Sequence, residues 1–115
     1  MTEKISSQNS EHYTWGEICE GWHLVKNDTL SVIQERVPAG RSEVRHYHNN
    51  SRQFFFILEG EGTIELEDKN VKLVKNEGIE IPPGIVHKFR NDSNEDVTFL
   101  VISSPKSHGD RINCE

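Results

Sequence analysis

Three histidines and one glutamine form the most distinctive pattern in this sequence of 115 residues. His46 and His48 are two residues apart, Gln53 follows five residues after His48, and His87 comes nearly forty residues after His48. Side chains two residues apart on a β-strand point to the same face, so His46 and His48 are expected to lie together. Imidazole nitrogens and an amide oxygen can bind a divalent metal ion. The sequence therefore predicts one metal site formed by His46, His48, Gln53 and His87.

These ligand types leave the identity of the metal open. Imidazole binds zinc, nickel, manganese and iron to different degrees, so the expected cofactor is one divalent ion from this group. A catalytic metal also keeps coordination positions open for water or substrate. No residue is assigned a catalytic role from the sequence, because no obvious inward acid or base accompanies the ligands.

The elements that must position these ligands are predicted to be short strands. Segments rich in β-branched and aromatic residues alternate with turn residues, a pattern typical of an antiparallel all-β domain. Residues 1–12 are expected to be a flexible tail, and residues 13–115 a single domain. The predicted strands cover residues 14–25 (with a break near Gly21), 30–37, 43–48, 53–58, 63–66, 71–74, 79–81, 86–90 and 97–103.

Alternation along the strands also predicts the walls of a pocket beside the metal. Phe55 and Ile57 share a strand face with Gln53, and Phe89 shares a face with His87. Apolar walls combined with a few polar groups are typical of small-molecule sites. We therefore expect a small-molecule ligand or substrate that contacts Phe55, Ile57 and Phe89.

The strand at residues 30–37 adds candidates for the same pocket. Either Gln34 and Arg36 or Glu35 must point inward, and the sequence does not decide which. An inward polar side chain here would be a candidate acid, base or anchor for the ligand. Gln34 and Arg36 are included among the predicted pocket residues.

The strand that carries Gln53 is apolar on its other face as well. Phe54, Phe56 and Leu58 alternate with the inward residues, so both faces of this strand are predicted to be covered. One cover is the interior of the domain, and the other is a second sheet or a second subunit. Aromatic residues are enriched at interfaces between subunits.

The composition argues against several classes of partner. A net charge of −6 opposes binding to nucleic acid or to an anionic membrane. No segment is apolar enough to span a bilayer, and the polar first residues lack the apolar core of a signal peptide. Two cysteines, Cys19 and Cys114, are too few for a disulfide framework. A cytoplasmic protein is therefore expected.

Two stretches of the sequence match a pair of motifs in the correct order. The first motif, G-x5-H-x-H-x3-4-E-x6-G, is matched by Gly40, His46, His48 and Gly60, with Gln53 in the glutamate position. The second motif, G-x5-P-x-G-x2-H-x3-N, is matched by Pro82, Gly84, His87 and Asn91, with Asn76 in place of the leading glycine. Asparagine tolerates the left-handed backbone conformation, so Asn76 is an acceptable substitute there.

On these motifs, the segment from Leu30 to Ile102 resembles the cupin superfamily, and in particular its small single-domain, RmlC-like conserved-barrel proteins. The resemblance implies an all-β double-stranded β-helix, also called a jelly-roll barrel. It implies that the four predicted ligands surround one metal at the wider end of the barrel. It also implies a homodimer, which is common among small cupins.

Gln53 replaces the glutamate of the first motif and so removes a negative charge from the ligand set. Neutral ligands are expected to leave the metal a stronger Lewis acid and to disfavour its higher oxidation states. We therefore predict a metal-binding cupin that acts on a small oxygen-rich molecule, a sugar acid or a keto acid, by isomerase or lyase chemistry. Two alternatives stay open: an iron-dependent dioxygenase, and a non-catalytic module that binds or senses a small molecule.

Overall fold

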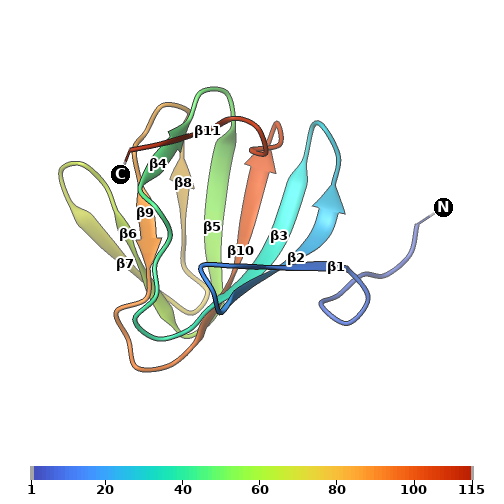
Figure 1. Cartoon of the computed structure of the whole chain (residues 1–115), viewed down its shortest axis with the longest axis horizontal. Helices are drawn as coiled ribbons and strands as arrows, with labels where there is room; N and C mark the ends of the chain where they lie inside the picture. Colours follow the sequence, from blue (N-terminus) through green and yellow to red (C-terminus); the bar gives the residue numbers. More distant parts are fainter. Residues whose placement is uncertain (1, 115) are drawn as a thin grey trace.

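The computed structural model describes residues 2–114, which form eleven β-strands (Figure 1). The strands are β1 (Glu11–Trp15), β2 (Cys19–Lys26), β3 (Ser31–Val37), β4 (His46–His48), β5 (Arg52–Glu59), β6 (Glu61–Glu65), β7 (Asn70–Val74), β8 (Gly78–Ile81), β9 (Lys88–Arg90), β10 (Val97–Ser104) and β11 (Arg111–Asn113). Among these residues, no helix is long and apolar enough to cross a membrane.

The strands form two layers that wrap around a common interior (Figure 1). One layer is a sheet of six antiparallel strands in the order β1-β2-β3-β10-β5-β8. The other layer contains the sheet β7-β6-β9 and the pair β11-β4. Two backbone bridges, Ser42 with Arg90 and His46 with His87, join these two parts. The predicted all-β jelly-roll architecture is confirmed.

The core lies between the layers and is built by alternate residues of the inner faces. Phe55, Ile57, Phe89 and Phe99 are each at most 2% exposed. The rings of Phe89 and Phe99 stack with their centroids 4.1 Å apart, and the ring of Phe55 meets His87 edge-on at 5.9 Å. Burial of one such side chain contributes roughly 1.5–3 kcal/mol. The apolar core therefore extends up to the predicted metal ligands and holds one of them in place.

Asn76 makes the turn between β7 and β8 in the left-handed conformation, with φ of 69°. Its backbone N–H donates to the carbonyl oxygen of Ile57 at 2.9 Å, which ties the turn to β5. The expectation that asparagine can replace the leading glycine of the second motif is confirmed. The turn brings β8 alongside β5, where Ile81 lies opposite Gln53.

The predicted break in the first strand segment was wrong in position. The chain turns at Gly16 and Glu17, with φ of 55° and 76°, rather than near Gly21. Gly21 lies within β2, directly opposite Tyr13 of β1. A glycine in a strand can mark a close approach of another group rather than a turn. Here that group is the ring of Tyr13, which a Cβ atom on Gly21 would approach to 2.3 Å.

Several other strands differ from the sequence prediction in their existence or their bounds. β11 was not predicted, because residues 111–113 show no apolar alternation and form a strand only by pairing with β4. Residues 43–45 and 86–87 lie outside the strands, since β4 begins at His46 and β9 begins at Lys88. β1 begins at Glu11, and the division into a flexible tail and a domain at residue 13 stays a prediction.

The outer face of β5 is less covered than its inner face. Phe54 is 38% exposed, whereas Phe56 and Leu58 are half-buried. The rings of Phe54 and Phe56 stack on this face with their centroids 6.1 Å apart. A single chain therefore covers the inner face of β5 and leaves the outer face partly exposed, and cover of that outer face by a second subunit stays a prediction.

Candidate metal centre and its cavity

The fold brings His46, His48 and His87 together. One nitrogen from each ring can be chosen so that all three lie within 4.8 Å of one another. His46 and His48 lie on one face of β4, as the alternation predicted, and are 2% and 5% exposed. His87 is fully buried, and its backbone exchanges two hydrogen bonds with that of His46, at 3.0 and 2.9 Å. Three convergent imidazoles are the ligand set of many divalent metal sites.

Two of these rings are oriented by backbone carbonyl groups. The Nδ1 atom of His46 lies 2.7 Å from the carbonyl oxygen of Val44, and the Nδ1 atom of His87 lies 2.9 Å from that of Ile85. Because a carbonyl oxygen can only accept, each Nδ1 carries the proton and each Nε2 keeps its lone pair. Such contacts to the non-ligating nitrogen are typical of metal-binding histidines.

Several polar atoms at this centre are buried without a partner among the described residues. They are Nε2 of His87, both ring nitrogens of His48 and Oε1 of Gln53. Buried polar groups are normally hydrogen-bonded, so orphaned atoms at one place call for an ion or ligand. The residues present therefore fit a divalent metal ion.

Gln53 is held with its carbonyl oxygen available. Its Nε2 atom donates to the hydroxyl oxygen of Ser103 at 3.1 Å, and its Oε1 atom has no partner among the described residues. Gln53 is 5% exposed and lines the same cavity as His46 and His48. It can thus supply a neutral oxygen to the site, as the sequence predicted. Its role as a ligand stays a prediction.

Burial keeps the imidazoles uncharged. It lowers the pKa of His46 to about 3 and that of His87 to about 4, and it lowers the pKa of His48 as well. Moving a charged ring out of water is unfavourable, so the neutral form is preferred. Neutral imidazole is the form that binds a metal.

The loop between His48 and Gln53 is fixed by Asp110. The carboxylate of Asp110 accepts hydrogen bonds from the backbone N–H groups of residues 49–51, at 3.1, 2.9 and 2.8 Å. These bonds lower the pKa of Asp110, because they favour its charged form. This role of Asp110 was not predicted from the sequence, since it depends on β11 lying beside β4.

A cavity of ≈ 860 Å³ opens at the candidate centre. Its lining includes His46, His48 and Gln53, and Phe55 and Val101 supply apolar wall. A cavity of this size can hold a small molecule beside a metal ion. Of the predicted pocket residues, Phe55 lines the cavity.

Two other predicted wall residues belong to the core. Ile57 and Phe89 are 0% and 1% exposed and are not part of the cavity lining. Phe89 packs instead against Phe55 and Phe99. Both residues share a face with a ligand, as predicted, but they lie further along their strands than the cavity reaches.

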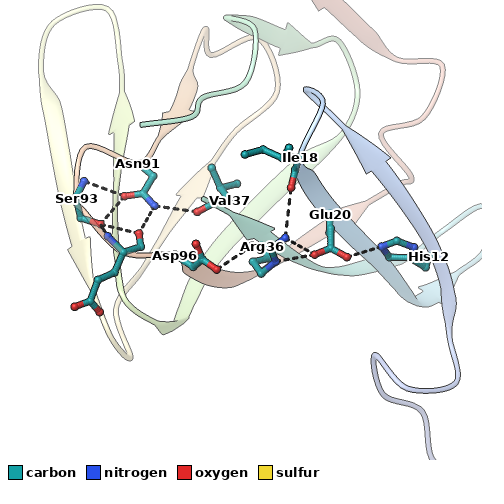
Figure 2. A network of polar contacts seen from close by, with 9 residues as sticks. His12, Ile18, Glu20, Arg36, Val37, Asn91, Ser93 and Asp96 are labelled. Atoms are coloured by element: carbon teal, nitrogen blue, oxygen red, sulfur yellow. Dashed lines mark hydrogen bonds and ion pairs between the residues drawn. The ribbon is translucent and has the colours of Figure 1, made fainter. Parts of the chain in front are cut away.

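The prediction for Gln34 and Arg36 is corrected by the register of β3. Glu35 lines the cavity, so Gln34 and Arg36 lie on the opposite face. Figure 2 shows Arg36 bound there to Glu20 and to Asp96, the latter at 2.8 Å. The guanidinium also donates to the carbonyl oxygen of Ile18. Arg36 joins three segments of the chain rather than anchoring a ligand.

The asparagine of the second motif also has a structural role. Asn91 is 1% exposed and donates to the carbonyl oxygens of Val37 and Glu95, at 2.9 and 2.7 Å (Figure 2). Its own Oδ1 accepts from the backbone N–H and the hydroxyl of Ser93. Asn91 thereby ties the end of β9 to β3 and shapes the loop that leads into β10.

The groups that line the cavity without having been assigned from the sequence include Tyr13, Glu35, Glu43 and Arg111. These four also line an adjoining space of ≈ 330 Å³. Alternation along residues 30–37 had left open whether Glu35, or Gln34 and Arg36, points inward. The positions of the other three depend on β1, the segment before β4 and β11, which no local pattern places next to the histidines.

Comparison with known proteins places the chain in a family. The model of the cupin domain matches residues 33–103. A protein of Methanocaldococcus jannaschii is 33% identical over 89 residues, which cover 76% of this chain and 71% of that protein. An acireductone dioxygenase of Xenopus tropicalis is 31% identical over 102 residues, covering 84% of this chain and 52% of that protein.

The fold has close counterparts among solved structures. The polyketide cyclase RemF from Streptomyces resistomycificus superposes with a TM-score of 0.86, covering 100% of this chain and 87% of that one. The two sequences are only 18% identical, so this likeness concerns the fold alone.

Proposed function

The chain belongs to the cupin family, and we propose that it is a metal-dependent enzyme acting on a small oxygen-rich molecule, a sugar acid or a keto acid, by Lewis-acid chemistry. The observation that carries this proposal is the uncharged donor set at the cavity. His46, His48 and His87 favour the neutral form, and Gln53 presents a carbonyl oxygen. None of these donors offsets the charge of a dication.

The cavity residues suit a ligand that is rich in oxygen. A divalent ion held by the histidines would draw electron density from a carbonyl or carboxylate oxygen of the ligand. Phe55 and Val101 exclude water from one side of the cavity, and Arg111 lies near enough to lower the pKa of the histidines. A guanidinium group there favours a ligand with a carboxylate.

A dioxygenase that uses iron is the second candidate. The relative from Xenopus tropicalis supports it, since that protein is named an acireductone dioxygenase and is 31% identical to this chain. This chain spans about half of that relative's length.

One set of experiments separates these functions. The protein is purified without chelators and its metal content is measured, and it is then incubated with uronates, 2-oxo acids and catechols, with and without oxygen. Turnover of an acid without oxygen consumption supports the proposal. Turnover that requires oxygen and oxidises iron(II) contradicts it in favour of the dioxygenase. Tight binding without turnover would instead identify a binding or sensing module.

We further propose that the protein is a homodimer that uses the outer face of β5. The half-exposed rings of Phe54 and Phe56 lie stacked on this face. Aromatic residues are enriched in interfaces, and a second copy would remove these rings from water.

A further inference from the structure

Tyr13, Gly21 and Glu35 form one row across three neighbouring strands. Tyr13 of β1 lies opposite Gly21 of β2, and Gly21 lies opposite Glu35 of β3. A Cβ atom on Gly21 would lie 2.3 Å from Cζ of Tyr13 and 2.5 Å from its hydroxyl oxygen. The tyrosine side chain therefore crosses β2 in the space that glycine leaves, and its hydroxyl donates to Oε2 of Glu35 at 3.2 Å.

This row ends in the same cavity as the candidate metal centre. Tyr13 and Glu35 line the cavity together with His46, His48 and Gln53. His48 and Gln53 are each 5% exposed and present unpartnered polar atoms there, which indicates that a ligand completes the site. Glu35 is not one of the convergent ligands, because the only metal-binding group found among residues 2–114 consists of the three histidines.

Of the two carboxyl groups in the cavity whose pKa is raised, Glu35 and Glu43, Glu35 is the less engaged. Glu43 accepts a hydrogen bond from the backbone N–H of Phe89 at 3.0 Å, and its own N–H donates to the carbonyl oxygen of Phe89. The side chain of Glu43 is thus bound to the backbone of β9. Glu35 is held by the hydroxyl of Tyr13.

We propose that Glu35 is the catalytic acid and base of this cavity, that Tyr13 positions it, and that the ligand is a small 2-oxo acid whose C–H bond next to the carbonyl group is broken. The inference rests on the proposed function, because it needs a ligand whose carbonyl oxygen is polarised at the histidines.

The proposed step is a reversible proton transfer. The carboxylate of Glu35 takes the proton from the carbon next to the carbonyl group, and the electron pair of that C–H bond forms a carbon–carbon double bond. The carbonyl oxygen takes the negative charge, which gives an enolate. Return of the proton from Glu35 to the same carbon uses the electron pair of the double bond, re-forms the carbonyl group, restores the carboxylate of Glu35 and completes an exchange, with no oxidant or reductant.

The surroundings of Glu35 suit this role. Burial, with a smaller contribution from the charge of Glu43, raises the pKa of Glu35 to about 8. The hydroxyl of Tyr13 and the charge of Arg111 act in the opposite direction. The thiol of Cys19 also lies near, since Glu35 helps to raise its pKa. A carboxyl group with a pKa near neutrality can both take and return a proton efficiently.

The test uses pyruvate as the probe and the zinc-loaded protein in deuterated water. Exchange of the methyl protons is followed by proton NMR as a function of pH. For the wild type, we expect a rate that rises with pH and levels off above the pKa of about 8, because only the carboxylate can accept the proton. Glu35→Gln should lower the rate by about 100-fold or more. Glu59→Gln is the matched control, since Glu59 is exposed and paired with Lys75, and it should leave the rate unchanged.

The variant Tyr13→Phe tests whether the hydroxyl of Tyr13 positions the carboxyl group of Glu35. Because the tyrosine hydroxyl lowers the pKa of Glu35, its removal should move the midpoint of the pH profile upward while exchange persists. A merely structural role for Tyr13 would lower the rate at every pH without moving the midpoint. Circular dichroism checks that each variant is folded, and Glu35→Asp, which keeps the carboxyl group, provides a second variant at position 35.

A second readout needs neither metal nor turnover. In metal-free protein labelled with carbon-13 at the glutamate carboxyl groups, the signal that Glu35→Gln removes should titrate near pH 8. Titration of that signal near the ordinary value of 4.5 would overturn the inference. Unchanged exchange in Glu35→Gln, or no exchange of pyruvate by the zinc-loaded wild type, would overturn it too. If the wild type fails to bind zinc, the proposed function fails, and the metal-free titration still decides the state of Glu35.

Discussion

The side-chain amide of Gln53 donates to the hydroxyl of Ser103 across 3.1 Å, and this bond decides which of its two polar atoms is available at the histidines. The two residues lie opposite each other on β5 and β10. Ser103 is 1% exposed and the bond is buried, so it is not exchanged for water. The carbonyl oxygen of Gln53 is thereby left as a donor at a cavity whose other donors are neutral.

Replacing Gln53 by glutamate should strengthen metal binding. A carboxylate brings a negative charge to the site, so we expect the Kd for zinc, measured by calorimetry, to fall by about tenfold, since 1.4 kcal/mol corresponds to a factor of ten. Ser103→Ala removes the bond that orients Gln53 and should weaken zinc binding by about tenfold or more. Equal affinities in all three proteins would show that residue 53 is not a ligand.

His87→Ala should abolish specific metal binding. Loss of one of three converging imidazoles removes a ligand that the remaining pair cannot replace, and we expect zinc affinity to fall at least about 100-fold. The matched control is His12→Ala, because His12 lies on the outer face and pairs with Glu20 (Figure 2). Zinc binding at one equivalent with unchanged affinity in His87→Ala would refute the proposed centre.

Asp110→Ala should act on the site through the backbone. It removes the acceptor of three N–H bonds in the loop between two predicted ligands, so we expect a lower midpoint in urea denaturation. Zinc binding should weaken as well, because the loop no longer holds His48 and Gln53 in place. Asp68→Ala, in the turn between β6 and β7, is the control, and an equal effect in the two variants would contradict this role of Asp110.

The stability of the metal-free protein should decrease as the pH rises from about 6.5 to about 8, above the range in which the lowered pKa values of the buried histidines have the opposite effect. The pKa of Glu35 is raised to about 8 and that of Glu43 to about 7, both from 4.5. Between 4.5 and these values the folded protein keeps protons on Glu35 and Glu43 that the unfolded chain has lost, so the contribution of these two groups to stability falls with pH until both have ionised. One unit of pKa elevation corresponds to about 1.4 kcal/mol.

Thermal denaturation at several pH values measures this effect. Glu35→Gln cannot ionise at that position, so its Tm should fall less with rising pH than the Tm of the wild type. Glu59→Gln should follow the wild type, because Glu59 is exposed. Parallel curves for the wild type and Glu35→Gln would mean that Glu35 is not protonated in the folded protein.

The proposed dimer can be tested by one charged substitution. Phe54→Lys places a charge among the apolar side chains of the outer face of β5 and should convert the dimer to a monomer in light scattering. Val74→Lys, at a residue of β7 that is 42% exposed, is the control and should leave the mass unchanged. A monomeric wild type, or a dimeric Phe54→Lys, would exclude this interface.

Local alternation predicted much of the centre, because it needs only the spacing of residues on one strand. His46 and His48 share a face for this reason, and Gln53 shares a face with Phe55 and Ile57. The turn at Asn76 was predictable from the backbone freedom of asparagine. The boundary between pocket and core was not predictable in this way. Alternation predicts which face of a strand a residue lies on, but it does not predict how far along the strand the cavity extends.

Which face of β3 points into the cavity could not be predicted from alternation. A shift of one residue in register exchanges the two faces of a strand, and residues 30–37 carry polar groups on both faces. Pairing with β2 and β10 settles the choice, so Glu35 faces the cavity and Arg36 pairs with Glu20 and Asp96. β11 was missed because its strand character comes from pairing with β4 rather than from its own residues.

The sequence by itself determined the cupin fold and the three histidines, because motif spacing and two-residue alternation are local properties of the chain. Only the tertiary structure decided which other groups share their cavity. Tyr13, Glu35 and Arg111 come from β1, β3 and β11, and they meet through strand pairings between segments far apart in the sequence. Such pairings depend on the packing of the whole barrel, so the hydrogen bond from Tyr13 to Glu35 across Gly21 could not be read from any one segment.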